Sequence, residues 1–211
     1  MKAIIVTGGN PPSEKLLKKY IDLQDYIIGV DKGCECLYKY KIVPNIILGD
    51  FDSCNPSIYE YYKNNNVENI KYNPEKDYTD THLAYRIAKE KGYKEIIMFG
   101  ATGTRLDHTL GNLGLFINSL EDNIDLKIID DHNKVRVINK KTTFKGEYGE
   151  LISFHALSNV VKNVNITGAK YTLDNYDMKL LEPRAICNEF LDDDITISFD
   201  EGLVMTIYPN D

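Results

Sequence analysis

The sequence contains no tryptophan and only four cysteines among its 211 residues. Cys34, Cys36, Cys54 and Cys187 lack the paired spacing of a zinc ribbon, so we expect no structural zinc site. The sequence shows neither a signal-peptide pattern nor an apolar run of membrane length. These absences lead us to expect a reduced, cytoplasmic protein that is not bound to a membrane.

An excess of positive charge is missing as well. The chain carries 25 Lys and Arg residues against 32 Asp and Glu residues, which gives a formal net charge of −7 at pH 7. A broad nucleic-acid-binding surface needs a basic face that neutralises many phosphates. We therefore expect no nucleic-acid partner, and any phosphate group must be held locally, by a metal ion and a few basic side chains.

The first half of the sequence alternates strand-like and helix-like segments. Short apolar runs are each followed by a segment whose apolar residues have helical spacing. We expect strands over 2–7, 26–30, 45–48, 69–72 and 95–99, and helices after Ser13 and over 33–40, 56–64, 79–91 and 107–120. This alternation predicts βαβ crossovers and a three-layer α/β domain, with a parallel sheet covered on both faces.

The second half has almost no helical spacing. Its short alternating or β-branched runs are separated by Gly, Asn and Asp, which predicts an antiparallel β-sandwich or barrel. The expected strands cover 126–129, 134–139, 151–156, 160–166, 195–199 and 203–208. We therefore expect an α/β domain over 1–122 and an antiparallel β-sandwich domain over 123–211.

Acidic residues stand where strands of the first half end or helices begin. They are Asp31, Asp50, Asp52, Asp80 and Asp107. The carboxyl ends of parallel strands meet at one edge of a sheet, and ligands of open α/β sheets bind in the crevice beyond that edge. Carboxylates gathered there repel one another unless a cation lies among them, so the pattern predicts Mg²⁺ and a phosphate-bearing substrate.

The segment Gly49-Asp50-Phe51-Asp52-Ser53 directly follows the apolar run 46–48. Two carboxylates one residue apart can both reach one hard cation, and Mg²⁺ is usually held by one or two carboxylates plus substrate phosphates. The alternative is that Asp52 and Ser53 cap the next helix, since both are favoured N-caps. For Asp52 alone both interpretations stay open, whereas for the pair we favour metal binding.

The segment 76–80 begins the next predicted helix. Asp77 or Thr79 is a candidate N-cap, and Asp80 in the first turn suits the helix macrodipole. Topology adds a second role, because this helix N-terminus lies at the same edge of the sheet as the other carboxylates. We expect Asp80 to point into the crevice and Lys76 to supply positive charge for a phosphate chain.

The segment 100–112 joins a strand to a helix and matches neither the Walker A spacing nor the dinucleotide GxGxxG pattern. Its polar and glycine residues include Gly100, Gly103, Arg105 and Asp107. The amide groups of a helix N-terminus can bind an anion, and the guanidinium of Arg105 can bind phosphate. We expect His108 to partner Asp107 or a backbone carbonyl, and Asn112 to face either the site or the helix packing.

Taken in order, DKG at 31–33, GDFDS at 49–53, KDYTD at 76–80 and GATGTRLDHTLGN at 100–112 resemble the motifs of the thiamine pyrophosphokinase family. In the second half, GAKYTL at 168–173 and CNE at 187–189 are similar to the family's G-x-x-Y-x-L and S-N-E segments, with Cys187 in place of serine. The resemblance covers most of the chain. It implies an α/β domain and a β-sandwich, joined in a homodimer with active sites at the subunit junction.

The resemblance also implies a reaction, in which the β,γ-pyrophosphoryl group of ATP moves to the hydroxyl of thiamine and AMP is released. The catalytic carboxylates would be Asp31, Asp50, Asp52, Asp80 and Asp107, of which Asp50, Asp52 and Asp80 would hold Mg²⁺. ATP would contact Lys76, Asp77, Thr79, Gly100, Gly103, Arg105, His108 and Asn112, and thiamine would contact Tyr171, Cys187 and Asn188. Either Asp80 or Asp107 could accept the proton of the thiamine hydroxyl.

Two other functions compete with this interpretation. A metal-dependent glycosyltransferase would explain the apolar strand and Asp-x-Asp at 46–52, but not the helix start at 76–80, the Arg105 loop or the β-rich half. A non-catalytic nucleotide- or thiamine-binding module is the second alternative. The retained carboxylates argue against it, because a binding module need not keep so many mutually repelling charges.

Overall fold

The computed structural model describes residues 1–52, 54–71, 77–103 and 105–210, and the chain forms two compact units, Met1–Asp131 and His132–Asp211. The sequence predicts a boundary after residue 122. The difference arises at β6 (Asp125–Ile129), which pairs in parallel with β5 (Glu95–Phe99) and so extends the sheet of the first unit. The expectation that 126–129 begins the antiparallel half is wrong, because a short apolar run does not encode its pairing direction.

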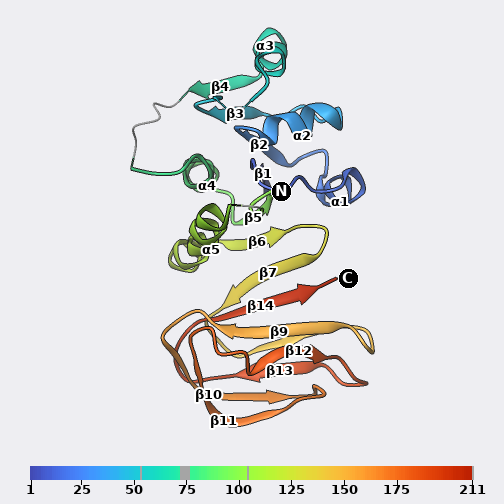
Figure 1. Ribbon diagram of the computed structural model, residues 1–211, viewed down its shortest axis with the longest axis vertical. Coiled ribbons are helices and arrows are strands. Elements are labelled where there is room, and N and C mark those ends of the chain that lie inside the picture. Colours follow the sequence, from blue (N-terminus) through green and yellow to red (C-terminus); the bar gives the residue numbers. More distant parts are fainter. Residues whose placement is uncertain (53, 72–76, 104, 211) are drawn as a thin grey trace. The chain divides into compact units, whose positions relative to one another are not determined.

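The first unit is a parallel β-sheet with helices on both faces, as predicted (Figure 1). Besides β5 and β6, its strands are β1 (Ala3–Val6), β2 (Tyr26–Val30), β3 (Ile46–Gly49) and β4 (Glu68–Lys71). Its helices are α1 (Glu14–Tyr20), α2 (Gly33–Lys39), α3 (Pro56–Asn64), α4 (Asp80–Glu90) and α5 (Leu106–Glu121). In the described part of the chain, no helix has the length and apolar character needed to cross a membrane.

The central strands are buried along most of their length because helices cover both faces. All four residues of β1 are buried, and so are the last four of β5. Val6 and Phe99 pack on one face against Leu17 of α1 and Leu37 of α2. Helices α4 and α5 lie on the opposite side of the sheet from α1 and α2 (Figure 1).

The strand order of the first unit reverses at β1. It reads β6-β5-β1-β2-β3-β4, so β1 pairs with β2 on one side and with β5 on the other. The chain therefore leaves β1 for one face of the sheet and leaves β5 for the other. In open α/β sheets, this reversal opens the crevice in which ligands bind.

The second unit consists of two antiparallel sheets around a shared apolar core, which confirms the predicted sandwich. One sheet has the order β12-β9-β14-β7 and the other β11-β10-β13-β8. The strands are β7 (Asn133–Ile138), β8 (Thr142–Phe144), β9 (Leu151–Ala156), β10 (Val160–Thr167), β11 (Leu173–Lys179), β12 (Ala185–Glu189), β13 (Ile195–Ser198) and β14 (Val204–Pro209). The sequence does not predict β8, β11 and β12, because β8 is short and the other two contain Asn or Asp, which are rare in strands.

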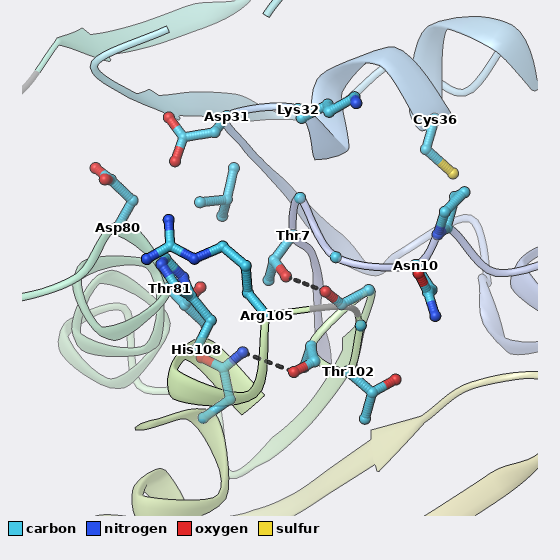
Figure 2. Close-up of a pocket in the computed structure, with 18 of the residues that line it drawn as sticks. Thr7, Asn10, Asp31, Lys32, Cys36, Asp80, Thr81, Thr102, Arg105 and His108 are labelled. Atoms are coloured by element: carbon cyan, nitrogen blue, oxygen red, sulfur yellow. Dashed lines mark hydrogen bonds between the residues drawn. The ribbon is translucent and has the colours of Figure 1, made fainter. Parts of the chain in front are cut away.

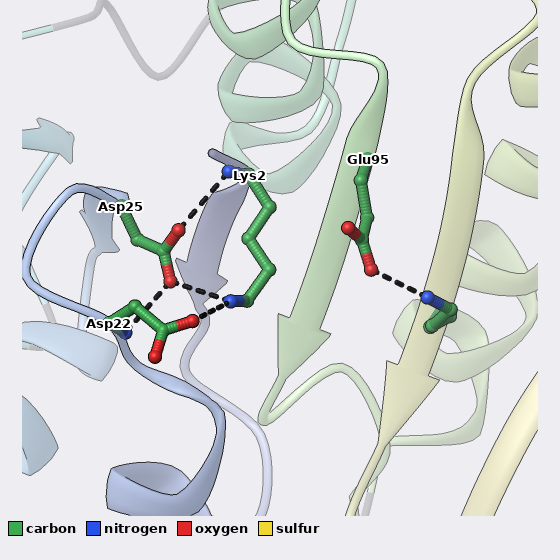
Figure 3. A network of polar contacts seen from close by, with 5 residues as sticks. Lys2, Asp22, Asp25 and Glu95 are labelled. Atoms are coloured by element: carbon green, nitrogen blue, oxygen red, sulfur yellow. Dashed lines mark hydrogen bonds and ion pairs between the residues drawn. The ribbon is translucent and has the colours of Figure 1, made fainter.

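An ion-pair network ties the start of β1 to the loop before β2 (Figure 3). The Lys2 ammonium lies 2.8 Å from a carboxylate oxygen of both Asp22 and Asp25, and Asp25 also accepts from the backbone amides of Lys2 and Asp22. The Asp25 side chain is 2% exposed, whereas that of Asp22 is 79% exposed. Burial alone would raise the pKa of Asp25, but these hydrogen bonds outweigh it and hold the pKa below its usual value.

We predict that Asp25→Asn lowers the free energy of unfolding by about 1–3 kcal/mol at neutral pH, because Lys2 loses its buried partner. Since the pKa of Asp25 is lower in the folded state, its contribution is present above the unfolded pKa of about 4 and is lost as the pH falls further. Denaturant titrations across this pH range should show a weaker acid dependence for the variant. Asp22→Asn is the exposed control and should change stability by less than about 1 kcal/mol; equal effects of the two substitutions would contradict the prediction.

Candidate active site

A large cavity of about 1160 Å³ lies at the carboxyl ends of the first unit's strands (Figure 2). Its lining comes from the β1–α1 loop, α2, the start of α4 and the β5–α5 loop with the first turns of α5. This position coincides with the reversal of strand order between β1 and β5. The cavity is slightly larger than sites that hold one small molecule, which leaves room for a nucleotide.

The floor of the cavity is built from two loops that are joined through their backbones. The amide of Gly9 donates to the carbonyl of Gly100 at 2.8 Å, and the amide of Asn10 donates to the carbonyl of Thr102 at 2.8 Å. The hydroxyl of Thr7 donates to the same Gly100 carbonyl at 2.5 Å (Figure 2). A Cβ atom at Gly9 would collide with both acceptor carbonyls, so glycine is required there.

Sequence reasoning treats residues 8–13 only as a turn and misses this loop as part of the site. The available signal was the pair Gly8-Gly9 directly after a buried strand. Gly100, which was predicted, has a φ of 66° and packs so closely on Thr7 that a Cβ atom would strike the Thr7 carbonyl. The two loops therefore depend on each other for their conformation.

Asp31 and Asp80 both line the cavity and point towards the same space, although 48 residues of sequence separate them (Figure 2). Asp31 has a φ of 46°, an uncommon conformation for a residue with a side chain. Its carboxylate lies against Gly49, where a Cβ atom would collide with it. The Asp31 carboxylate can occupy this position only because Gly49, at the end of β3, has no side chain.

Asp50 and Asp52 lie in the described part of the chain but are not among the residues that line this cavity. The Asp50 carboxylate accepts a hydrogen bond from the amide of Asp52 at 3.0 Å, which closes a local turn. Asn55 caps α3 by accepting from the amide of Ser57 at 3.0 Å, so the alternative in which Asp52 caps that helix is wrong. The role of the pair in metal binding stays a prediction.

The start of α4 resolves the alternatives for segment 76–80. Thr79 is the N-cap, and its hydroxyl accepts from the amide of His82 at 3.2 Å. Asp77 is exposed and lines the cavity together with Thr79 and Asp80. Lys76 lies outside the described residues, as do Ser53 and Thr104 of the motifs.

Arg105 is held at the cavity by Asp107. Two guanidinium nitrogens contact the Asp107 carboxylate at 2.6 and 3.2 Å, and Arg105 lines the cavity whereas Asp107 does not. The hydrogen bonds from Arg105 lower the pKa of Asp107 to about 2. Asp107 therefore pairs with Arg105 and orients its guanidinium at the rim of the cavity.

Asn112 fastens α5 to the loop before it. Its buried side-chain amide donates to the carbonyl of Ala101 at 2.7 Å. Gly103 packs against the backbone of Gly9 and Asn10, and the exposed His108 lines the cavity. Gly103 and Asn112 thus give the loop its shape, while the position of His108 leaves it able to contact a ligand.

The carboxylates at the cavity fit Mg²⁺ as a nucleotide-bound ion. Among the described residues, no three Asp, Glu, His or Cys side chains are grouped closely enough to hold a metal ion by themselves. Mg²⁺ does not need such a cage, because it is commonly bound by one or two carboxylates together with substrate phosphates and water. Asp31 and Asp80 can supply that share of the ligands.

In the second unit, Tyr171 helps to line a smaller hollow of about 400 Å³. Asn188, which is 1% exposed, accepts from the amide of Tyr171 at 2.9 Å and donates to its carbonyl at 2.7 Å. Cys187 is exposed, has a φ of 52° and donates its amide to the hydroxyl of Ser153. Asn188 therefore fixes the backbone of Tyr171, a residue that is 58% exposed.

Both units match models of known domains. Residues 17–128 match the model described as thiamin pyrophosphokinase, catalytic domain, and residues 135–204 match the model described as thiamin pyrophosphokinase, vitamin B1 binding domain. Thiamine pyrophosphokinase of Bacillus subtilis (strain 168) is 34% identical over 214 residues, covering 100% of both chains. Thiamine pyrophosphokinase 1 of Oryza sativa subsp. japonica is 27% identical over 183 residues, covering 80% of this chain and 67% of the relative.

Solved structures show the same similarity. The crystal structure of thiamine pyrophosphokinase from Bacillus subtilis has a TM-score of 0.89 at 32% identity and covers 100% of both chains. Thiamin pyrophosphokinase from Candida albicans has a TM-score of 0.81 at 18% identity, covering 99% of this chain and 89% of the other, which extends the likeness of fold to a more distant sequence.

Proposed function

The chain belongs to the thiamine pyrophosphokinase family, and from this premise we propose that it transfers the β,γ-pyrophosphoryl group of ATP to thiamine, giving thiamine diphosphate and AMP. The observation that carries the proposal is the cavity at the strand reversal, where Asp31, Asp80 and Arg105 face one space above two joined backbone loops. Membership of the family favours this activity over a glycosyltransferase or a non-catalytic binding module.

In the proposed reaction, the hydroxyl oxygen of thiamine forms a bond to the β-phosphorus of ATP, and the bond from that phosphorus to the α,β-bridging oxygen breaks. AMP leaves, and the hydroxyl proton passes to a carboxylate. Such a transfer requires mainly positioning and charge neutralisation from the protein. Asp80 and Asp107 are the two candidates for the proton acceptor: Asp80 lines the cavity but is also a proposed metal ligand, whereas Asp107 is paired with Arg105 and does not line the cavity.

The phosphate groups would be held by Arg105, by amide groups at the start of α4 and α5, and by Lys76. We further propose that Asp50, Asp52 and Asp80 bind Mg²⁺ together with the nucleotide, with Asp31 beside them. The bound ion would neutralise charge on the phosphate oxygens during transfer. Thr79 would act by capping α4, and Asn112 by holding the β5–α5 loop through its hydrogen bond to Ala101.

Thiamine would bind through the second unit, where Tyr171 offers an exposed aromatic face to the cationic thiazolium ring. Asn188 would support this face through its two hydrogen bonds to the Tyr171 backbone, and Cys187 lies beside it in the sequence. Lys170 lies 5.8 Å from the Tyr171 ring centroid but is paired with Glu189 at 2.6 Å, which offsets its positive charge.

We predict that the protein incubated with ATP, Mg²⁺ and thiamine produces AMP and thiamine diphosphate in equal amounts, detected by mass spectrometry. Asp50→Asn should lower the rate by at least about 100-fold if this carboxylate binds the metal, a loss of roughly 3 kcal/mol in transition-state stabilisation. Asp22→Asn, at the opposite edge of the sheet, is the matched control and should retain the rate. Undiminished turnover of Asp50→Asn would remove Asp50 from the metal site, and no AMP from the wild type would overturn the activity.

We also propose that the protein is a homodimer, as the family resemblance implies. Supporting this, α5 exposes an apolar stripe of Leu106, Leu110 and Ile117, which are 68%, 59% and 44% exposed. Residues at these spacings share one face of a helix, and an exposed apolar stripe favours protein association. The stripe begins beside Arg105, which would place the interface next to the cavity.

We predict a dimeric mass for the wild type in sedimentation velocity and a shift towards the monomeric mass for Leu110→Glu, because a charge would be buried at the interface. Leu23→Glu is the control, since Leu23 is fully exposed in the loop before β2. A monomeric wild type with full activity would refute the dimer, and a dimeric Leu110→Glu would refute the assignment of its interface to α5.

A further inference from the structure

The β3–α3 loop, which carries Asp50 and Asp52, is tied to helix α2 by the side chain of Glu35. Glu35 lies in the first turn of α2 and is half-buried. Its carboxylate accepts a hydrogen bond from the backbone amide of Asn55 at 2.8 Å. Asn55 is the N-cap of α3, so this hydrogen bond fixes the point at which the loop ends and the helix begins.

The β3–α3 loop has a backbone conformation that needs such support. Phe51, between the two aspartates, has a φ of 61°, which is an outlier for a bulky residue. Its ring packs on Tyr59 of α3 with 4.7 Å between ring centroids, and its carbonyl accepts from the amide of Cys54 at 3.2 Å. A strained backbone persists only where the surrounding contacts hold it, and such positions concentrate at functional sites. The hydrogen bond between Asn55 and Glu35 is one of these contacts.

Glu35 connects this loop to the part of the cavity that contains Asp31. Both residues line the cavity, and α2 begins just after Asp31 along the chain. A second, buried contact joins α2 to α3, because the hydroxyl of Tyr62 donates to the carbonyl of Cys34 at 3.2 Å. Helix α2 is thus joined both to the end of the β3–α3 loop and to α3 itself. The position of the loop aspartates relative to Asp31 therefore depends on the contact that Glu35 makes.

We propose that Glu35 is a positioning residue for the metal-binding carboxylates, an inference that rests on the proposed use of ATP with a divalent cation. By accepting from the Asn55 amide, Glu35 holds Asp50 and Asp52 where they can share a nucleotide-bound ion with the carboxylates of the cavity. Removing a group that orients metal ligands typically costs about 10- to 100-fold in metal affinity or activity. The role requires an acceptor oxygen and not a charge, so glutamine at this position can fill it.

The test measures how much Mg²⁺ strengthens nucleotide binding. Titration calorimetry with the α,β-methylene analogue of ATP, which resists transfer, gives its dissociation constant in Mg²⁺ and in EDTA, and the ratio of the two is the gain due to the metal. In Glu35→Ala this gain should fall roughly tenfold, because the loop aspartates lose their position. Glu35→Gln should keep the wild-type gain. A purely structural role for Glu35 would weaken binding equally under both conditions and leave the ratio unchanged.

Glu60→Ala is the matched control, since Glu60 is an exposed glutamate of α3 whose contact with Lys63 is 3.9 Å long; it should keep the wild-type gain. An unchanged gain in Glu35→Ala would overturn the proposal. An equal loss in Glu35→Ala and Glu35→Gln would also overturn it, because the charge of Glu35 would then act on the ion directly. A wild type whose binding of the analogue does not respond to Mg²⁺ would overturn it as well. Failure of the wild type to release AMP from ATP and thiamine, with the gains as expected, would instead overturn the proposed function alone.

Discussion

The site depends on a backbone contact between two loops that leave neighbouring strands in opposite directions. Gly9 and Gly100 approach so closely that the amide of Gly9 donates a hydrogen bond to the carbonyl of Gly100, and neither position has room for a side chain. This contact fixes the floor of the cavity that Asp31, Asp80 and Arg105 line. The residues of the β1–α1 and β5–α5 loops that line the cavity are positioned by this contact, because both loops take part in it.

Much of the fold could be predicted from the sequence because its local signals agree with its topology. Helix α3 covers the predicted residues 56–64, and β5 covers 95–99. The features that the sequence did not predict are those that depend on tertiary contacts. The pairing direction of β6 depends on its neighbour β5, and β11 is a strand despite Asp174, Asn175 and Asp177 because it pairs along its length with β10.

The site was predictable where a charge stands at the end of a strand or the start of a helix. Asp31, Asp80 and Arg105 meet at one cavity for that reason. The sequence cannot distinguish a carboxylate that binds a ligand from one that pairs with a neighbouring side chain. Asp107 accepts two hydrogen bonds from the guanidinium of Arg105. The sequence did not identify the β1–α1 loop as part of the site, because the loop contributes through backbone amide groups. Such groups are the same in every residue except proline, and only the glycines of the loop indicate their role.

The most direct test of the central role of the loop contact is the affinity for ATP when one glycine is changed. Titration calorimetry with the α,β-methylene analogue of ATP, which resists transfer, would compare Gly9→Ala with Gly111→Ala. Gly111 lies in α5, and a Cβ atom added there meets no other atom within 4 Å. We expect Gly9→Ala to bind the analogue at least roughly tenfold more weakly, a loss of about 1.4 kcal/mol, and Gly111→Ala to bind it like the wild type. Equal affinity of Gly9→Ala and the wild type would contradict the account.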